Sequence, residues 1–173
     1  MNTAPDHIQF CVRCGAPMAT RLVGDKLRRA CTACDSVHFT DPKVGVGVFV
    51  LDGAGRVLLV RRVMNPERGK WSIPAGFLDQ GEDPAETAVR EAHEETGLEV
   101  VIDGLVDVYH NPPGEGGASI FILYRAHTVG GTLQAGDDAD GAGFFARDAL
   151  PELAFISTRD SIQRLWPQTK PDR

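Results

Sequence analysis

The pattern of apolar and polar positions predicts a β-hairpin shortly after residue 42. The runs VGVGVFVL at 44–51 and RVLLVRRV at 56–63 are largely apolar, and the DGAG between them is a strong turn sequence. We therefore expect two neighbouring antiparallel strands joined by a tight turn.

Apolar runs recur later in the chain and predict further strands. These are expected at 98–110, in two segments that meet at Gly104, at 119–129 and at 143–147. Glycine, proline and acidic residues predict loops at 111–118 and 134–143. Strands and helices with mixed connections in one chain indicate an α/β or α+β sandwich.

Two helices are expected, and the first is clearly delimited at 84–96. Asp83 is a favourable N-cap, proline suits the first helical position, and Gly97 stands where a left-handed residue ends a helix. The second helix is expected near the C-terminus, at about 157–166.

The first helix carries an unusual group of carboxylates. At 100° per residue, Glu91, Glu94 and Glu95 fall within an arc of about 100° beside a narrow apolar stripe. Glu91 and Glu95, at i,i+4, repel each other by a few tenths of a kcal/mol. A bound Mg²⁺ would offset this repulsion, because it prefers oxygen ligands. The alternative to a metal site is an ordinary polar helix face in contact with solvent. The irregular segment at 71–81 favours a site, because such a loop brings backbone groups near the carboxylates.

Composition limits the partners that the chain can have. Its 173 residues carry 18 Lys and Arg against 24 Asp and Glu, and this net charge of −6 lacks the footprint of a duplex nucleic-acid binder, so nucleic acid is disfavoured as a partner. Binding of nucleic acid by the N-terminal segment is kept as an alternative, with Arg28 and Arg29 as its basic cluster. No run of 18 apolar residues occurs, and the start, MNTAPDHIQF, has neither the basic nor the apolar region of a signal peptide. We therefore expect a cytoplasmic protein without a membrane partner.

All four cysteines fall in the first 34 residues, as the pairs Cys11/Cys14 and Cys31/Cys34. The spacing C-x2-C-x16-C-x2-C is typical of a four-thiolate zinc site, in which each pair offers two sulfurs to one tetrahedral ion. Two disulfides or a redox dithiol are the alternatives, but a reducing cytosol opposes disulfides and no redox βαβ unit is apparent. The sequence therefore predicts one structural Zn²⁺.

The cysteine-rich segment is expected to form a domain of its own. Residues 1–43 carry six Lys and Arg and four acids, a local charge of +2, with few aliphatic residues. So short a segment cannot build a sufficient core, so zinc must supply its folding energy. The turn at Asp41-Pro42 predicts a zinc ribbon at 1–41 and a second domain at 42–173.

The loop and the first helix together form a longer motif, GFLDQGEDPAETAVREAHEETGL at 76–98. It resembles the Nudix box, G-x5-E-x7-R-E-x2-E-E-x-G-L. The fixed positions are Gly76, Glu82, Arg90, Glu91, Glu94, Glu95, Gly97 and Leu98. Ala92 replaces the larger aliphatic residue that is usual in the family. The chain from about 42 to 155 is thus similar to the Nudix hydrolases.

The resemblance implies a fold, an activity and a set of site residues. The fold is an α/β/α sandwich with a mixed sheet, and the activity is Mg²⁺- or Mn²⁺-dependent cleavage of a nucleoside diphosphate linked to another moiety. Arg90 orients Glu91, and Glu82 supports the loop and helix. The implied catalytic-metal ligands are Glu91, Glu94, Glu95 and the carbonyl of Ala75 or Gly76.

Other residues are candidates for the general base and for substrate contacts. The base for the attacking water is expected to be Glu91, Glu94 or an acid of the run 137–140. Substrate contacts are expected from Phe77, Tyr109 and Asp138, whereas Trp71 is expected to be a core or loop anchor.

A four-cysteine ribbon directly before such a domain is similar to the zinc-ribbon ADP-ribose and FAD pyrophosphatases, which implies AMP as a product. The NADH pyrophosphatases have S-Q-P-W-P-F-P-x-S shortly after the box, and residues 99–117 hold no such string. NADH pyrophosphatase and housecleaning hydrolysis of nucleoside triphosphates remain alternatives. An ADP-ribose sensor is a third, although sensors usually lose the metal-binding glutamates. A homodimer is also among the expected assemblies.

Overall fold

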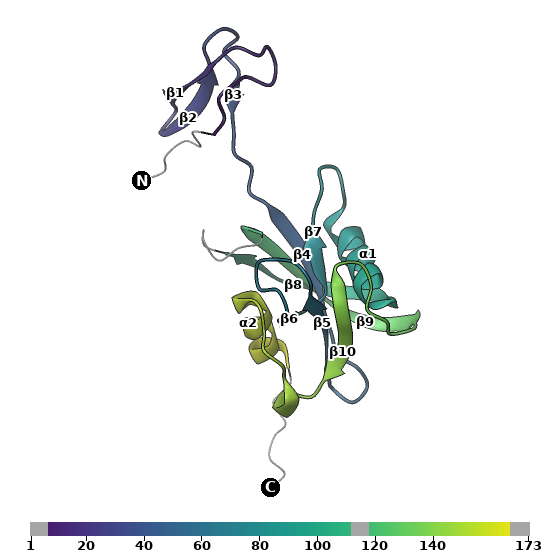
Figure 1. Cartoon of the computed structure of the whole chain (residues 1–173). Helices are drawn as coiled ribbons and strands as arrows, with labels where there is room; N and C mark the ends of the chain where they lie inside the picture. The colour runs from purple at the N-terminus through teal and green to yellow at the C-terminus, as the bar shows by residue number, and fades with distance from the viewer. Residues whose placement is uncertain (1–6, 112–117, 167–173) are drawn as a thin grey trace. The chain divides into compact units, whose positions relative to one another are not determined.

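The computed structural model describes residues 7–111 and 118–166. The chain divides into two compact units, Met1–Asp41 and Pro42–Arg173 (Figure 1). Within the described residues, no helix is long and apolar enough to span a membrane.

The first unit is a small antiparallel sheet. Its strands are β1 (Met18–Val23), β2 (Lys26–Cys31) and β3 (Val37–His38), in the order β1-β2-β3. The buried side chains of this unit include Cys11, Met18 and Cys31, which form one small cluster. So small an apolar cluster agrees with the expectation that a metal supplies much of the folding energy.

The second unit contains two sheets. The larger has the order β7 (Ala75–Phe77), β4 (Val44–Val50), β9 (Ile120–Gly131), β8 (Leu98–His110), and it is mixed because β4 and β9 run parallel. The smaller is antiparallel, in the order β10 (Ala139–Phe145), β5 (Val57–Arg62), β6 (Trp71–Ser72).

Helices α1 (Pro84–Thr96) and α2 (Ile156–Leu165) cover opposite faces of these sheets (Figure 1). One core cluster places α1 against one face and includes Val46, Val48, Val50, Leu58, Ala88, Ala92, Leu98 and Val100. Phe49 belongs to a second cluster with Ile162 of α2. The buried strand β4 therefore has a helix on each side, and the expected α/β/α sandwich with a mixed sheet is confirmed. A short 3-10 turn, η1 (Arg147–Ala149), precedes α2.

The limits of α1 agree with the prediction. Asp83 accepts hydrogen bonds from the backbone N–H groups of Ala85 (2.8 Å) and Glu86 (3.1 Å), and Gly97 ends the helix with φ 68°. A left-handed residue at this position satisfies the last carbonyls, and glycine adopts it at little cost.

The predicted hairpin at 44–63 is wrong in its pairing. The turn itself forms, with Asp52 accepting hydrogen bonds from the backbone of Ala54 and Arg56. Beyond a single bridge between Leu51 and Val57, however, β4 and β5 diverge into different sheets. Both runs are apolar on both faces, so each is buried more completely in the middle layer of a sandwich than in a two-stranded hairpin.

Two other predicted elements differ in extent. Residues 98–110 form one strand, in which the register shifts on either side of Gly104 instead of breaking there. Strand β10 begins at Ala139, inside the predicted loop at 134–143. Its small residues permit this pairing, because a side chain at Gly141 would press against Trp71. Most of the predicted loop at 111–118 lies outside the described residues.

Candidate functional site

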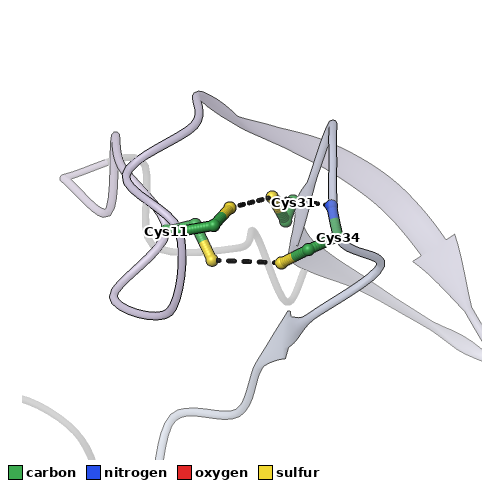
Figure 2. Close-up of side chains that lie close together, drawn as sticks. Cys11, Cys31 and Cys34 are labelled. Atoms are coloured by element: carbon green, nitrogen blue, oxygen red, sulfur yellow. Dashed lines mark hydrogen bonds between the residues drawn. The ribbon is translucent and has the colours of Figure 1, made fainter.

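The four cysteine sulfurs of the ribbon all lie within 4.8 Å of one another. The sulfurs of Cys11 and Cys34 are 3.7 Å apart and those of Cys14 and Cys31 are 3.5 Å apart. Figure 2 shows the labelled members turned toward one another. A tetrahedral Zn²⁺ with Zn–S bonds of about 2.3 Å requires sulfurs about 3.8 Å apart. All four are free thiols, so the geometry fits one zinc ion and not disulfides.

Backbone amides favour the thiolate form of one member of this cluster, Cys31. The N–H groups of Ala33 and Cys34 point at the sulfur of Cys31, at 3.3 and 3.4 Å. These two donors lower the pKa of the Cys31 thiol to about 6. The thiolate is the form that binds metal, so the turn favours the ligand state of this cysteine at neutral pH.

In the second unit, Arg90 draws together three carboxylates of the box. Its Nη1 lies 2.8 Å from Oε2 of Glu94 and 3.0 Å from Oε1 of Glu91, and its Nη2 lies 3.3 Å from Oε1 of Glu82. The other oxygen of Glu82 accepts a 2.9 Å hydrogen bond from the backbone N–H of Asp79. Glu82 thus joins the loop to the helix, as predicted.

The third helix carboxylate, Glu95, is buried. Its Oε2 accepts a 2.9 Å hydrogen bond from the backbone N–H of Ala75, and the residue is only 4% exposed. Burial raises the pKa of Glu95 to about 9, and the nearby negative charge of Asp138 adds to the rise. A cation beside this carboxylate would favour its ionised form.

Gly76 permits the close packing of β7 against α1. Any side chain at this position would overlap the carboxylate of Glu91. Burial also raises the pKa of Glu91, against the opposing effect of Arg90. The first glycine of the box therefore lets the carboxylate of Glu91 approach the backbone of β7 closely.

A cavity of about 560 Å³ opens beside these residues. Its lining includes Ala75, Gly76, Phe77, Arg90, Glu91 and Asp138. The size lies within the range of small-molecule pockets. Of the predicted substrate contacts, Phe77 and Asp138 therefore face the cavity.

Tyr109, the third predicted substrate contact, packs toward α2. Its hydroxyl is 3.3 Å from Oγ of Ser161 on α2, and its ring packs 6.4 Å from that of Phe121. Among the described residues, it is not part of the cavity lining. Tyr109 is only partly buried there, and its predicted contact with substrate stays a prediction. Trp71, by contrast, packs edge-on against Phe145 at 4.7 Å, which confirms it as a core anchor.

The structure separates the three acids of the run 137–140. Asp137 and Asp138 line the cavity. Asp140 pairs with Nε of Arg61 at 2.7 Å instead. The turn places Asp137 at φ 51° and so presents neighbouring acids in different directions.

Sequence reasoning missed two cation–aromatic pairs on the cavity wall. Nζ of Lys43 lies 5.1 Å from the ring centroid of Phe77, and the guanidinium of Arg62 lies 4.8 Å from that of Phe155. All four residues line the cavity. No local motif marks them, because they come from segments far apart in the chain.

The helix carboxylates are the type of ligand that a hard divalent cation prefers, since Mg²⁺ and Mn²⁺ take oxygen ligands. Within the described parts of the chain, however, only the four cysteines already converge closely enough to share an ion. Arg90 holds Glu91 and Glu94, while the Ala75 amide holds Glu95. Bringing the three carboxylates around one cation therefore requires side-chain rotation.

Comparison with known proteins identifies the family. The model of the NUDIX domain matches residues 41–165. The chain belongs to the Nudix family. The family predicted from the box is thereby confirmed, and the four-cysteine cluster is consistent with the expected zinc ribbon.

Two known proteins illustrate what this chain is similar to. An ADP-ribose pyrophosphatase of Methanocaldococcus jannaschii is 40% identical over 107 residues, 61% of this chain and 63% of that protein. The NAD-capped RNA hydrolase NudC of Chromobacterium violaceum is 32% identical over 146 residues, 84% of this chain and 52% of that protein. This chain therefore spans between half and two thirds of the length of these two relatives.

A solved structure matches the fold of this chain over most of its length. The crystal structure of a NUDIX hydrolase from Nitrosomonas europaea matches with a TM-score of 0.81 at 31% identity. The match covers 91% of this chain and 90% of that one.

Proposed function

We propose that this Nudix protein is a divalent-metal-dependent hydrolase that cleaves the diphosphate of ADP-ribose to AMP and ribose 5-phosphate. The observation that carries the proposal is the contact of Arg90 with the box carboxylates at the wall of a cavity. The similarity to an ADP-ribose pyrophosphatase supports the choice of substrate. FAD, which would give AMP and FMN, is the neighbouring possibility within the same substrate class.

The residues that would hold Mg²⁺ or Mn²⁺ are Glu91, Glu94 and Glu95, with the carbonyl of Ala75 or Gly76. When bound, the cation neutralises phosphate charge and lowers the pKa of coordinated water. Arg90 holds Glu91 and Glu94 in position through its 3.0 and 2.8 Å contacts. Gly76 leaves room for Glu91 against the backbone.

Asp138 is our candidate for the general base, because it lines the cavity close to Glu95. A carboxylate there accepts the proton of the attacking water, provided that it is ionised. Glu91 is the second candidate on the same wall. Asp138→Asn should therefore lower kcat more than it raises KM.

The cations Lys43 and Arg62 provide positive charge on the cavity lining, which otherwise includes several acids. We propose that they attract the anionic diphosphate of the substrate. Arg62 is partly engaged, because its Nε donates a 3.2 Å hydrogen bond to the carbonyl of Pro66. Arg62→Gln should therefore raise KM with a smaller effect on kcat.

A substrate panel tests the proposal. ADP-ribose, FAD, NADH and nucleoside triphosphates would each be incubated with Mg²⁺ or Mn²⁺, and AMP and phosphate release would be measured. The proposal requires AMP from ADP-ribose as the preferred reaction. Preferred release of pyrophosphate from nucleoside triphosphates would assign the housecleaning alternative instead, and tight ADP-ribose binding without turnover would assign a sensor.

An NADH pyrophosphatase is the second candidate. The NudC match covers 84% of this chain, against 61% for the ADP-ribose pyrophosphatase. Against it stands the absence of the NADH pyrophosphatase string after the box. A kcat/KM for NADH tenfold above that for ADP-ribose, equal to about 1.4 kcal/mol of transition-state preference, would favour this second candidate.

A further inference from the structure

We propose that one face of the ribbon sheet binds single-stranded nucleic acid. The surface consists of Arg21, Lys26, Arg28 and Phe39 and is called the basic face below. None of these residues lines the hydrolase cavity, so the proposal does not depend on the proposed substrate.

The strand register places three cations on the same side of the sheet. Arg21 pairs directly with Arg28, and Val23 pairs directly with Lys26. Directly opposite residues on neighbouring strands project from the same face, and residues two apart along a strand do so too. Two like charges directly opposite destabilise a sheet. An anionic partner would remove this repulsion.

Among the described residues, these cations form no ion pair, although Asp25 lies beside Lys26 in the turn between β1 and β2. Strands β1 and β2 contain no acidic residue. Arg29, on the opposite face, has a different role. It donates hydrogen bonds to Thr20 and to the backbone carbonyls of Ile8 and Met18, so it is a structural cation.

An aromatic ring adjoins the cations. The guanidinium of Arg28 lies 4.6 Å from the ring centroid of Phe39, and Phe39 is 55% exposed. Cations that track phosphates, combined with an exposed ring on which a base can stack, are the elements of single-strand binding. Base faces are accessible in a single strand and hidden in a duplex, which favours the single strand as the occupant.

The net charge of −6 does not oppose this local interaction. It is a sum over the whole chain, whereas the ribbon unit, residues 1–41, carries five Lys and Arg against four acids, a charge of +1. At physiological ionic strength the Debye length is about 8 Å, so exposed charges beyond that distance are largely screened. The basic face therefore acts through its own cations.

Salt-dependent binding of a labelled oligouridine to the full-length, zinc-loaded protein tests the proposal. Fluorescence anisotropy would be measured at several KCl concentrations, without added divalent cations. The slope of log K against log salt is about −0.7 per phosphate contacted on a single strand. Arg21→Gln/Arg28→Gln should therefore make the slope less steep by about 1.4. The charge-matched control Arg56→Gln/Arg147→Gln, in the second unit, should leave it unchanged.

Phe39→Leu separates stacking from charge. Loss of one stacked base should weaken binding about fivefold or more, with little change in the salt slope. If the double variant loses zinc, Lys26→Gln replaces it and should make the slope less steep by about 0.7.

Three results would overturn the proposal: no binding, equal weakening by the control variant, or equally tight binding of a duplex without an effect of Phe39→Leu. Hydrolysis of ADP-ribose by the basic-face variants should equal that of the wild type. Failure of this proposal thus leaves the proposed hydrolase intact, and the reverse also holds.

Discussion

The backbone N–H of Ala75 donates a 2.9 Å hydrogen bond to Oε2 of the buried carboxyl group of Glu95. This contact fastens the loop strand of the Nudix box to its helix, because Ala75 begins β7 and Glu95 lies in the last turn of α1. The same burial raises the pKa of Glu95 to about 9. Without a cation, this carboxyl group is therefore predominantly protonated at neutral pH.

The first prediction follows from this pKa. A carboxyl group whose pKa is raised on folding stabilises the fold below its unfolded pKa, here 4.5, and that contribution is lost as the pH rises toward about 9. Glu95→Gln keeps an acceptor for the Ala75 amide but does not titrate. In Mg²⁺-free buffer, the stability of the wild type relative to this variant should fall between pH 5 and 9.

Urea denaturation at several pH values measures this difference. The difference in free energy of unfolding between the two proteins can change with pH by at most about 1.4 kcal/mol per pH unit, because one proton is involved. Saturating Mg²⁺ should reduce this change with pH, because a cation favours the ionised carboxylate. Parallel stability curves for the two proteins would contradict the account of Glu95.

The second prediction concerns Glu94. Its side chain is 41% exposed and, among the described residues, forms an ion pair only with Arg90, so Glu94→Gln should change stability by less than about 1 kcal/mol. An amide does not supply the negative charge that holds Mg²⁺, so kcat should fall by orders of magnitude. Glu86→Gln, an exposed position on the same helix, is the matched control and should keep wild-type activity. Wild-type turnover of Glu94→Gln would remove Glu94 from the metal site.

The third prediction concerns Arg90 as a positioning residue. Arg90→Lys keeps the charge but not the fork that reaches Glu82, Glu91 and Glu94 together. Loss of a residue that orients metal ligands typically costs 10- to 100-fold in metal affinity or activity. The Mg²⁺ concentration at half-maximal rate should therefore rise in the variant. A change in stability alone, with an unchanged Mg²⁺ dependence, would make Arg90 purely structural.

The fourth prediction concerns zinc. Elemental analysis should find one zinc per chain, bound by Cys11, Cys14, Cys31 and Cys34. Cys31→Ser should expose the amides of β1 and β2 to hydrogen exchange while those of α1 stay protected, since metal binding supplies folding energy only to the segment that binds it. Four titratable thiols in protein purified without chelator, together with no zinc, would contradict this prediction.

The sequence alone was sufficient to predict those features that depend on residues close together in the chain. Asp83 and Gly97 delimit α1 because capping depends on neighbouring residues only. The paired cysteines predicted their own cluster in the same way, because the spacing of each pair determines the turn that presents its sulfurs.

Features that depend on distant partners could not be predicted. The runs at 44–51 and 56–63 were correctly identified as strands, but their pairing depends on β9 and β10, which come much later in the chain. Likewise, Tyr109 lies under α2, and Arg62 reaches the cavity beside Phe155. No residue near these positions in the sequence indicates such contacts.

The central claim is that the carboxylates of α1 support metal-dependent cleavage of a nucleoside diphosphate. Its most direct test is the rate of AMP release from ADP-ribose, with and without Mg²⁺ or Mn²⁺, by the wild type and by Glu94→Gln. The account predicts equimolar AMP and ribose 5-phosphate from the wild type only when a divalent cation is present, and a rate lower by orders of magnitude for the variant. AMP release that is independent of the cation, or equal in the two proteins, would contradict it.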